Sequence, residues 1–308
     1  VELVTMATKT AAVVSIFALY ATVICGAFSP APTTSRSQDG FALGVKASSD
    51  RRSFLTNGLG GALGSASLLL TSRAASAGDT KVLVLGGTGL VGSEVVKSLK
   101  SQGVDVVATS TNGRDGTIEL DFTKGNVDST IETLAKGCTA VISCVGAIGS
   151  AQDGVINSAT GLAARGSKSA GVDKFVYVSV APEVKKFAEG IDFLEDYMTG
   201  KTFSEDSVTS YFGEKGILIK PTFIYGGDSF GLTPPRVTTG YGKVIEAILA
   251  SAPLRAATTI APEGIIKIAL EPPVASTAVA NAAVASALGK ATQTSLDTHD
   301  KINAAAAL

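Results

Sequence analysis

The stretch KVLVLGGTGLVG, residues 81–92, decides what this chain folds into. Its first five residues, Lys81–Leu85, form a short apolar run that predicts a buried strand. Glycines at positions 86, 89 and 92 follow at once, and Ser93–Gln102 then has the amphipathic pattern of a helix. A strand, a glycine turn and a helix in this order predict a dinucleotide-binding fold.

Each glycine of this turn has a separate predicted part. We expect Gly86 to allow the tight turn, Gly89 to let the backbone approach a pyrophosphate, and Gly92 to let the helix pack closely on the strand. Free amides at the helix start, together with the helix dipole, favour the negative charge of the phosphates. The alternative is a glycine-rich turn without a ligand. The predicted cofactor contacts of this segment are Gly86, Gly87, Thr88, Gly89, Leu90, Val91 and Gly92.

The end of the second predicted strand, Asp105–Ser110, bears on the choice between NADP and NAD. NAD enzymes commonly place an acidic residue there, which binds the 2′-hydroxyl of the ribose. This chain has the sequence TSTNGR at residues 109–114, without an acid. Small hydroxyls such as Ser110, together with Arg114, suit a 2′-phosphate. We therefore predict NADP(H), with NAD(H) as the alternative cofactor and an ordinary exposed loop cation as the alternative for Arg114.

Further strand and helix signals alternate along the chain. Strands are predicted at Thr117–Leu120, Ala140–Cys144 and Lys174–Ser179, and helices at Asp128–Lys136, with Asp128 as the N-cap, and at Val155–Ala170. This alternation predicts an α/β protein with a doubly wound, mostly parallel sheet, which is a Rossmann fold, and a small C-terminal substrate-side extension. Residues after the strands are predicted to contact the adenine or the ribose: Asp121, Phe122, Val145, Gly146 and Ala147.

Tyr197 and Lys201 are four residues apart, so on a helix their side chains share one face. Ser179 ends the fifth predicted strand. This set resembles the Ser/Tyr/Lys machinery of short-chain dehydrogenases. The resemblance implies that Tyr197 gives or takes the carbonyl proton, and that Ser179 hydrogen-bonds the substrate oxygen. It also implies that Lys201 lowers the tyrosine pKa from about 10 and binds the nicotinamide ribose. Structural roles for Tyr197 and Ser179 are the alternatives.

The resemblance extends from Lys81 to about Leu288, and residues 174–179 (KFVYVS) and 220–226 (KPTFIYG) also carry it. The chain is similar to the plastid and mitochondrial branch of atypical short-chain dehydrogenases/reductases. That branch includes the NAD(P)-binding accessory subunit of respiratory complex I and proteins linked to coenzyme Q synthesis. Its members commonly have Arg-Pro-Gly where this chain has Lys-Pro-Thr, and Pro221 is carried over as a cofactor contact.

Two functions follow from this resemblance. The first is an NADP-dependent oxidoreductase or isomerase that acts on a small or lipophilic carbonyl, alcohol or quinone-like substrate in the plastid. The second is a nucleotide-binding assembly or stability factor for a thylakoid complex or for quinone metabolism, without catalysis. Many members of the branch bind a nucleotide and have no established turnover, so both functions stay open, and a redox sensor is a third.

The chain is predicted to consist of a targeting leader at 1–77, the nucleotide-binding domain at 78–290 and a frayed tail at 291–308. In the leader, Lys9 and the apolar run Ala11–Ile24 precede a cluster of small residues. This pattern predicts a secretory signal peptide, and a membrane anchor is the alternative.

Three further motifs of the leader predict its destination. Ala27–Pro30 resembles the cleavage motif of proteins sent to secondary plastids, and Ala31–Asp50 has the composition of a transit peptide. Arg51-Arg52, a weakly apolar run and Ala75–Ala77 resemble a twin-arginine signal. We therefore predict a plastid of the secondary type and delivery to the thylakoid lumen, with the stroma as the alternative. The mature protein is expected not to span the membrane.

Composition excludes several classes of function. The formal net charge is −1 and no basic run is present in the domain, so nucleic acid is not an expected partner. Cys138 and Cys144 would stand about 20 Å apart along one strand, too far for a disulfide. The single histidine, His299, lies far from both, so no structural or catalytic metal site is predicted.

Overall fold

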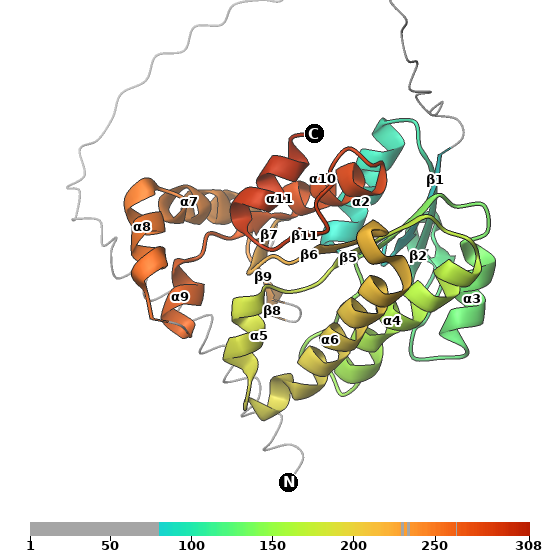
Figure 1. The fold of residues 1–308 in the computed structure, drawn as a ribbon, viewed down its shortest axis with the longest axis horizontal. Helices are drawn as coiled ribbons and strands as arrows, with labels where there is room; N and C mark the ends of the chain where they lie inside the picture. The colour runs from blue at the N-terminus through green and yellow to red at the C-terminus, as the bar shows by residue number, and fades with distance from the viewer. Residues whose placement is uncertain (1–79, 229–230, 233–234, 263) are drawn as a thin grey trace, which may run out of the picture. The chain divides into compact units, whose positions relative to one another are not determined.

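The computed structural model describes residues 80–228, 231–232, 235–262 and 264–308 (Figure 1). The predicted targeting leader lies outside these residues. The described chain is built on a seven-stranded sheet with the order β11-β6-β5-β4-β1-β2-β3, and all six pairings are parallel. This confirms the predicted doubly wound Rossmann fold. The strands are β1 (Lys81–Leu85), β2 (Asp105–Ser110), β3 (Ile118–Glu119), β4 (Ala140–Ser143), β5 (Lys174–Val178), β6 (Gly216–Ile219) and β11 (Ser295–Leu296).

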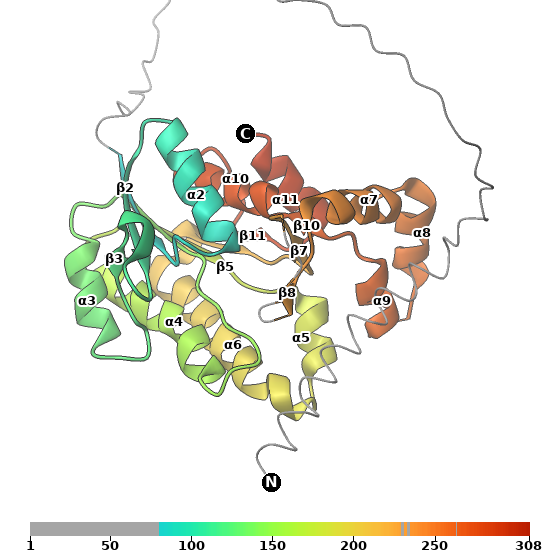
Figure 2. The ribbon, with the colours of Figure 1, turned by 180° about the vertical axis from the view of Figure 1, so that it is seen from behind.

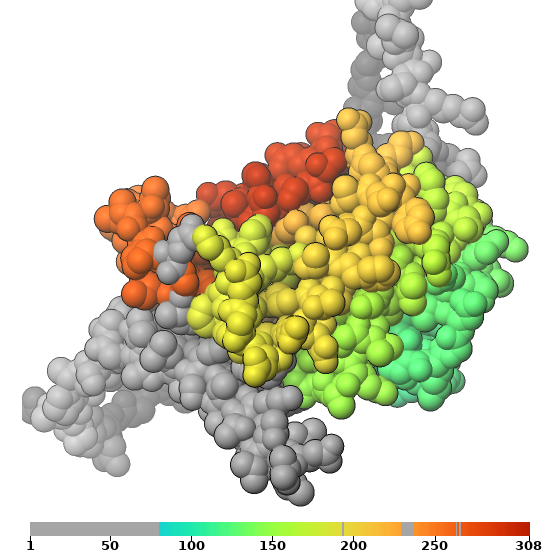
Figure 3. Space-filling model, turned by 60° about the horizontal axis from the view of Figure 1, so that its bottom comes forward, coloured from blue at the N-terminus to red at the C-terminus, as the bar shows by residue number. Residues whose placement is uncertain are grey.

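Helices cover both faces of this sheet (Figures 1 and 2). One face carries α2 (Leu90–Ser101), α10 (Ser276–Ala287) and α11 (His299–Ala306). The other carries α3 (Val127–Leu134), α4 (Asp153–Ser169) and α6 (Asp192–Phe212), which form much of the surface seen in Figure 3.

Alternation along β1 explains why the run Lys81–Leu85 is apolar throughout. Successive side chains of a strand point to opposite faces of the sheet. Val82 and Val84 pack with α2 and α10, whereas Leu83 and Leu85 pack with α3 and α4. All four side chains are fully buried, as expected of a parallel sheet with two covered faces.

The N-cap of α3 is Asn126, so the prediction of Asp128 as the cap was wrong. Asn126 has an extended backbone, and its side chain accepts a hydrogen bond from the Ser129 amide at 3.4 Å. Asp128 lies in the first turn instead, where its carboxylate pairs with Arg165 of α4. Asn and Asp cap helices about equally well, so the residue type alone does not choose between Asn126 and Asp128. Val127 is buried and is the first residue of α3, which makes Asn126 the N-cap.

A C-terminal extension is present beyond β6. It contains α7 (Thr239–Leu249), α8 (Ala252–Ile260) and α9 (Ile265–Leu270), which lie to the left of the sheet in Figure 1. Neither α8 nor α9 was predicted from the sequence, because both are short and rich in small or β-branched residues. The remaining elements are α5 (Pro182–Ala188), the parallel pair β7 (Ile224–Tyr225) and β10 (Val274–Ala275), and the antiparallel pair β8 (Gly231–Leu232) and β9 (Pro235–Arg236). Two short 3-10 helices, η2 (Arg114–Gly116) and η3 (Gly213–Lys215), complete the described elements.

Residues 291–308 are part of the fold, so the prediction of a frayed tail was wrong. Strand β11 extends the sheet by pairing with β6, and α11 packs on α10 with Ile302 fully buried. The Thr298 side chain caps α11 by accepting a hydrogen bond from the Lys301 amide at 3.2 Å. The apolar side chains of this segment are few, but they share one face of the helix.

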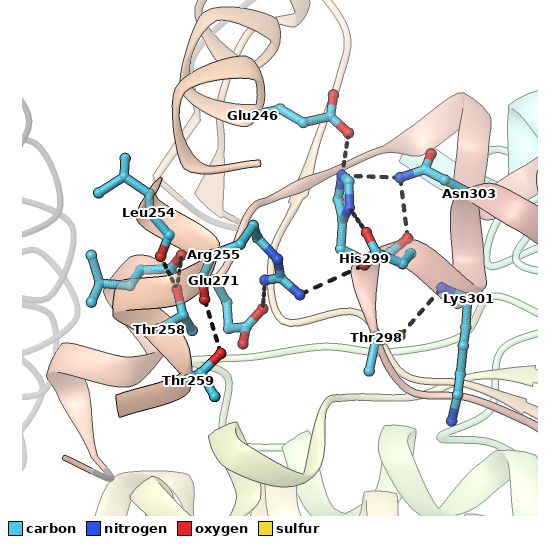
Figure 4. Close-up of polar contacts among 12 residues, drawn as sticks. Glu246, Leu254, Arg255, Thr258, Thr259, Glu271, Thr298, His299, Lys301 and Asn303 are labelled. Atoms are coloured by element: carbon cyan, nitrogen blue, oxygen red, sulfur yellow. Dashed lines mark hydrogen bonds and ion pairs between the residues drawn. The ribbon is translucent and has the colours of Figure 1, made fainter. Parts of the chain in front are cut away.

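His299 ties the C-terminal helix α11 to the extension (Figure 4). Its Nε2 lies 2.8 Å from Oε1 of Glu246 on α7, and its Nδ1 lies 3.0 Å from Oδ1 of Asp300. Asp300 in turn lies 3.8 Å from Arg255 of α8, which pairs with Glu271 at 2.8 Å. The end of the chain therefore contributes to the position of α7 and α8.

Within the part of the chain that the structure describes, no helix combines the length and apolar character needed to cross a membrane. The same residues hold no group of three or more His, Cys, Asp or Glu side chains arranged to bind a metal ion. Cys138 and Cys144 are both free thiols.

Candidate functional site

The turn after β1 has a geometry that requires glycine at two positions. Gly86 has φ +78°, a region that other residues rarely adopt. A Cβ atom at Gly92 would lie 2.1 Å from the carbonyl oxygen of Gly86, so α2 could not approach β1 with any side chain there. The turn is closed by a hydrogen bond from the Gly89 amide to the Gly86 oxygen at 3.0 Å.

The N-terminus of α2 is open in a way that suits a phosphate. Its N-cap is Gly89, which has no side chain to cap the helix, and its first turn contains no acidic residue. A Cβ at Gly89 would meet only the Gly86 oxygen, at 3.3 Å, within 4 Å. The first amides of a helix have no partners within it, so these residues fit the pyrophosphate of a dinucleotide.

A cleft of about 390 Å³ opens at this turn, in the range of ligand sites. It lies where β1 separates β4 from β2, the point at which the strand order reverses and ligands bind in such sheets. Ten predicted cofactor contacts line it: Gly86, Thr88, Gly89, Ser110, Arg114, Asp121, Phe122, Val145, Gly146 and Ala147. Of the other predicted contacts, Gly87, Leu90, Val91 and Gly92 form the turn and the helix start, and Lys201 and Pro221 do not line it.

Five further residues line the cleft and were not among the predicted contacts. They are Thr111, Thr123, Cys144, Gln152 and Ile156. Each lies close after a strand of the sheet or, for the last two, near the start of α4. The rule that ligands bind at the carboxyl ends of parallel strands could have identified them.

The segment that ends β2 and follows it places the guanidinium of Arg114 and the hydroxyls of Ser110 and Thr111 in the cleft lining. Arg114 donates from Nη2 to the carbonyl oxygen of Thr88 at 3.4 Å, so it reaches across to the glycine turn. Thr117 donates to the Arg114 oxygen at 2.6 Å, and the Ser110 hydroxyl, 2.6 Å from that of Thr117, must then be the donor of the pair. Arg114 and Thr111 therefore have donors available to a 2′-phosphate, whereas Ser110 offers lone pairs.

Asp121 lines the cleft, but its carboxylate is engaged by its own loop. It accepts hydrogen bonds from the amide and the hydroxyl of Thr123, at 3.0 and 2.7 Å, and pairs with Lys124 at 2.9 Å. The bond from Lys124 and those from Thr123 lower the pKa of Asp121 to about 2. An adenine in contact with Asp121 would therefore have to share the carboxylate oxygens with Thr123 and Lys124.

Lys201 lies directly behind the wall of the cleft. Its ammonium group donates to the carbonyl oxygens of Val145 and Val178, both at 3.4 Å, and so bridges the ends of β4 and β5. A Cβ at Gly146 would lie 3.0 Å from its Nζ. The residue is only 4% exposed, and this burial lowers its pKa to about 8, although the charge of Glu205 acts in the opposite direction.

Tyr197 lies beside Lys201 on α6, as the spacing predicted. The centre of its ring is 5.7 Å from Nζ of Lys201. The hydroxyl has a pKa above its ordinary value, first because the protein desolvates it, and then because Asp153 and Glu205 are negatively charged. The resemblance implies that Lys201 lowers this pKa, whereas desolvation, Asp153 and Glu205 all raise it.

Ser179 is buried next to a carboxylate that the sequence analysis missed. Its hydroxyl donates to Oε1 of Glu205 at 2.5 Å. The other oxygen of Glu205 pairs with Lys185 at 2.8 Å and Lys220 at 2.9 Å. Glu205 follows Lys201 by four residues on α6, so the same spacing argument that paired Tyr197 with Lys201 could have identified it.

Pro221 lies beside the Ser179 segment rather than in the cleft wall. Its carbonyl oxygen accepts a hydrogen bond from the amide of Ala181 at 3.1 Å. The Ser179 amide similarly donates to the oxygen of Ile219 at 2.8 Å. The chain segments after β5 and β6 therefore run side by side, which places Lys220 near Glu205.

Comparison with known proteins identifies the domain that contains this cleft. Residues 86–213 match the family model described as NAD(P)H-binding. The chain contains an NAD(P)-binding domain of the Rossmann type. An uncharacterized chloroplastic protein of Arabidopsis thaliana is 32% identical over 155 residues, which are 47% of this chain and 51% of that protein. The chain thus spans about half the length of this curated relative.

Several solved structures are similar to parts of this chain. The oxidoreductase ylbE of Lactococcus lactis is 21% identical, with a TM-score of 0.39 over 49% of this chain and 72% of its own. UDP-N-acetylglucosamine 4-epimerase of Bacillus cereus is 13% identical, with a TM-score of 0.44 over 70% of this chain and 73% of its own. A short-chain dehydrogenase/reductase superfamily protein of Agrobacterium tumefaciens with bound NAD is 22% identical, with a TM-score of 0.38 over 47% of this chain and 49% of its own.

Proposed function

We propose that this protein is an NADP(H)-dependent oxidoreductase of the atypical short-chain dehydrogenase/reductase type. Its substrate would be a small or lipophilic carbonyl, alcohol or quinone-like compound. One observation carries the proposal: Lys201 lies against the Val145–Gly146 wall of the same cleft onto which the glycine turn opens, and Tyr197 stands beside it. Phosphate binding and proton transfer would thus occur at two ends of one site.

Three side chains of this chain would act on the substrate. NADPH supplies a hydride when it is bound. Tyr197 keeps its proton at neutral pH, because its pKa is above the ordinary value, and is thus ready to protonate a carbonyl oxygen. Lys201 would contact the nicotinamide ribose, and Ser179, whose own proton is donated to Glu205, would accept a hydrogen bond from the alcohol form of the substrate.

A second function is supported by two features of the same residues. The raised pKa of Tyr197 leaves almost no phenolate near neutral pH to take up a proton, and the hydroxyl proton of Ser179 is already donated to Glu205. Both features suit a domain that binds a nucleotide for stability or assembly. Such a factor would serve a thylakoid complex or quinone metabolism through peripheral association, as members of the complex I and coenzyme Q branch do for their own systems.

We further propose that the protein acts in a plastid of the secondary type, in the thylakoid lumen, with the stroma as the alternative. The leader motifs at residues 1–77 support this, and so does the chloroplastic relative of Arabidopsis. Immunogold labelling or fractionation of intact plastids would test it. Recovery of the mature protein outside plastids would contradict the assignment.

The function is tested by titrating the purified protein with NADPH and NADH in a calorimeter, followed by turnover assays on panels of aldehydes, ketones, alcohols and quinones. We expect saturable NADPH binding and turnover of at least one compound class. Binding without turnover, together with co-purification of a thylakoid complex, would favour the second function. Absence of binding to either nucleotide would exclude both.

Arg114→Gln is expected to weaken NADPH binding by about 10–100-fold and to leave NADH binding nearly unchanged. The reason is that a charged hydrogen bond to a 2′-phosphate contributes about 1.5–3 kcal/mol, and NADH lacks that phosphate. Calorimetric Kd values for both nucleotides give the ratio. Lys136→Gln, which removes an exposed positive charge away from the cleft, is the matched control. Equal losses for the two nucleotides would show that Arg114 does not select NADP.

A further inference from the structure

Glu205 is a charged side chain that forms three polar contacts near the proposed catalytic residues. It is 7% exposed and lies on α6, one helical turn after Lys201. One carboxylate oxygen accepts the Ser179 hydroxyl, and the other pairs with Lys185 of α5 and Lys220 after β6. A single side chain therefore connects three elements that converge on the site.

These contacts fix the direction of the Ser179 hydrogen bond. Two ammonium groups pair with the carboxylate and hold the pKa of Glu205 below its usual value, against the effect of burial, so it stays ionised. An ionised carboxylate has only lone pairs, so the proton between it and Ser179 must come from the hydroxyl. Ser179 is left with lone pairs to offer, and the substrate group that meets it must itself be a donor, such as an alcohol hydroxyl.

The same carboxylate influences the charge of Lys201. Residues four apart on a helix face each other, and an opposite charge at that range favours the charged form of both. The other groups around the ammonium do not supply a second negative charge near pH 7, because burial raises the pKa of the Cys144 thiol to about 12 and the pKa of both tyrosines. The groups that face Lys201 are Glu205 and Tyr197 on its own helix, Tyr177 of β5, Cys144 after β4 and Lys185 of α5.

We propose that Glu205 is a positioning residue of this site, which holds the Ser179 hydroxyl as a hydrogen-bond acceptor toward the substrate and keeps Lys201 protonated behind the cleft wall. The proposal rests on the proposed function for the roles of Ser179 and Lys201. The direction of the Ser179 hydrogen bond and the charge of Lys201 can both be measured without nucleotide or substrate.

Glu205→Gln changes both parts of this role while it preserves the shape of the side chain. Lys185 and Lys220 can only donate, so they would turn the amide oxygen toward themselves and the amide nitrogen toward Ser179. The hydrogen bond to Ser179 would then reverse, and its hydroxyl would become free to donate. The negative charge beside Lys201 would be lost at the same time.

The test follows the Lys201 side-chain amine by NMR in the nucleotide-free protein between pH 5 and 10, with Lys201→Arg used to assign the signal. In the wild type we expect a titration midpoint near pH 8. In Glu205→Gln the midpoint should fall by about 1–3 pH units, the range for loss of a neighbouring opposite charge. Ser179→Ala retains that charge and should leave the midpoint unchanged, so a shift in Glu205→Gln that is no larger than in Ser179→Ala would overturn the proposal.

Neutron diffraction from deuterium-exchanged wild-type crystals tests the direction of the hydrogen bond between Ser179 and Glu205. The deuterium on the Ser179 oxygen should point at Glu205, and a deuterium pointing elsewhere would overturn the proposal. If Glu205→Gln fails to fold, the wild-type titration still decides, because a Lys201 midpoint below pH 7 would show that Glu205 does not keep it charged. Adding NADPH afterwards reports separately on whether the protein binds nucleotide, so failure of the proposed function is distinguished from failure of this role.

Discussion

Gly92→Ala is expected to abolish NADPH binding and to lower the free energy of unfolding by about 3 kcal/mol or more. The new Cβ would lie 2.1 Å from the backbone oxygen of Gly86, and neither backbone can yield without moving α2 off β1. The helix N-terminus would then no longer face the phosphates. Calorimetry with NADPH measures the first effect, and urea denaturation measures the second.

Gly240→Ala is the matched control for this prediction. Gly240 also lies in the first turn of a helix, α7, but a Cβ there would meet no atom within 4 Å. Alanine favours a helix over glycine by about 1 kcal/mol, so this variant should be as stable as the wild type or slightly more so. If Gly92→Ala matched Gly240→Ala in stability and in Kd, the close packing of α2 on β1 could not be what glycine is needed for.

The glycine turn shows which parts of the fold the sequence determines locally. The φ angle of Gly86 and the packing of Gly92 depend on residues within six positions of each other, so the motif specifies the geometry by itself. The alternation of buried strands and helices is similarly local, since each side chain points to a face set by its neighbours. For these reasons the parallel sheet, apart from β11, and most of the cleft lining could be predicted.

The C-terminal segment shows what local signals leave out. The helix α11 is rich in alanine, and its sequence alone fits a solvated tail. It folds back because Ile302 finds a place in the core against α10, and because His299 meets Glu246, which is 53 residues earlier in the sequence. Contacts at this separation depend on the finished sheet, so no periodicity in the sequence reports them.

The Glu205 cluster could be predicted only in part for the same reason. The spacing from Lys201 to Glu205 is visible in the sequence, but the partners of Glu205 come from α5, from the end of β5 and from the segment after β6. Similarly, no local sequence pattern indicates that desolvation raises the pKa of Tyr197. Charge and proton positions at the site follow from burial, which is a property of the assembled domain.

Tyr197→Phe is expected to lower kcat by about 10²–10⁴-fold, the usual contribution of a positioned acid or base, while the Kd for NADPH stays unchanged. The substitution removes only the hydroxyl, and the ring continues to fill its place on α6. Steady-state rates with any substrate found in the panel give kcat, and calorimetry gives Kd. Tyr211→Phe, at a residue of the same helix that is 37% exposed, is the matched control and should retain wild-type rates.

The pH dependence of the wild-type reduction rate tests the protonation states proposed for Tyr197 and Lys201. Tyr197 acts as an acid in this direction, and its raised pKa keeps the proton in place well above neutral pH, so Tyr197 should not limit the rate there. Lys201 titrates first, at about pH 8, and its charged form exists below that value, so the rate should fall as the pH rises through 8. Equal rates in Tyr197→Phe and the wild type would remove Tyr197 from the chemistry.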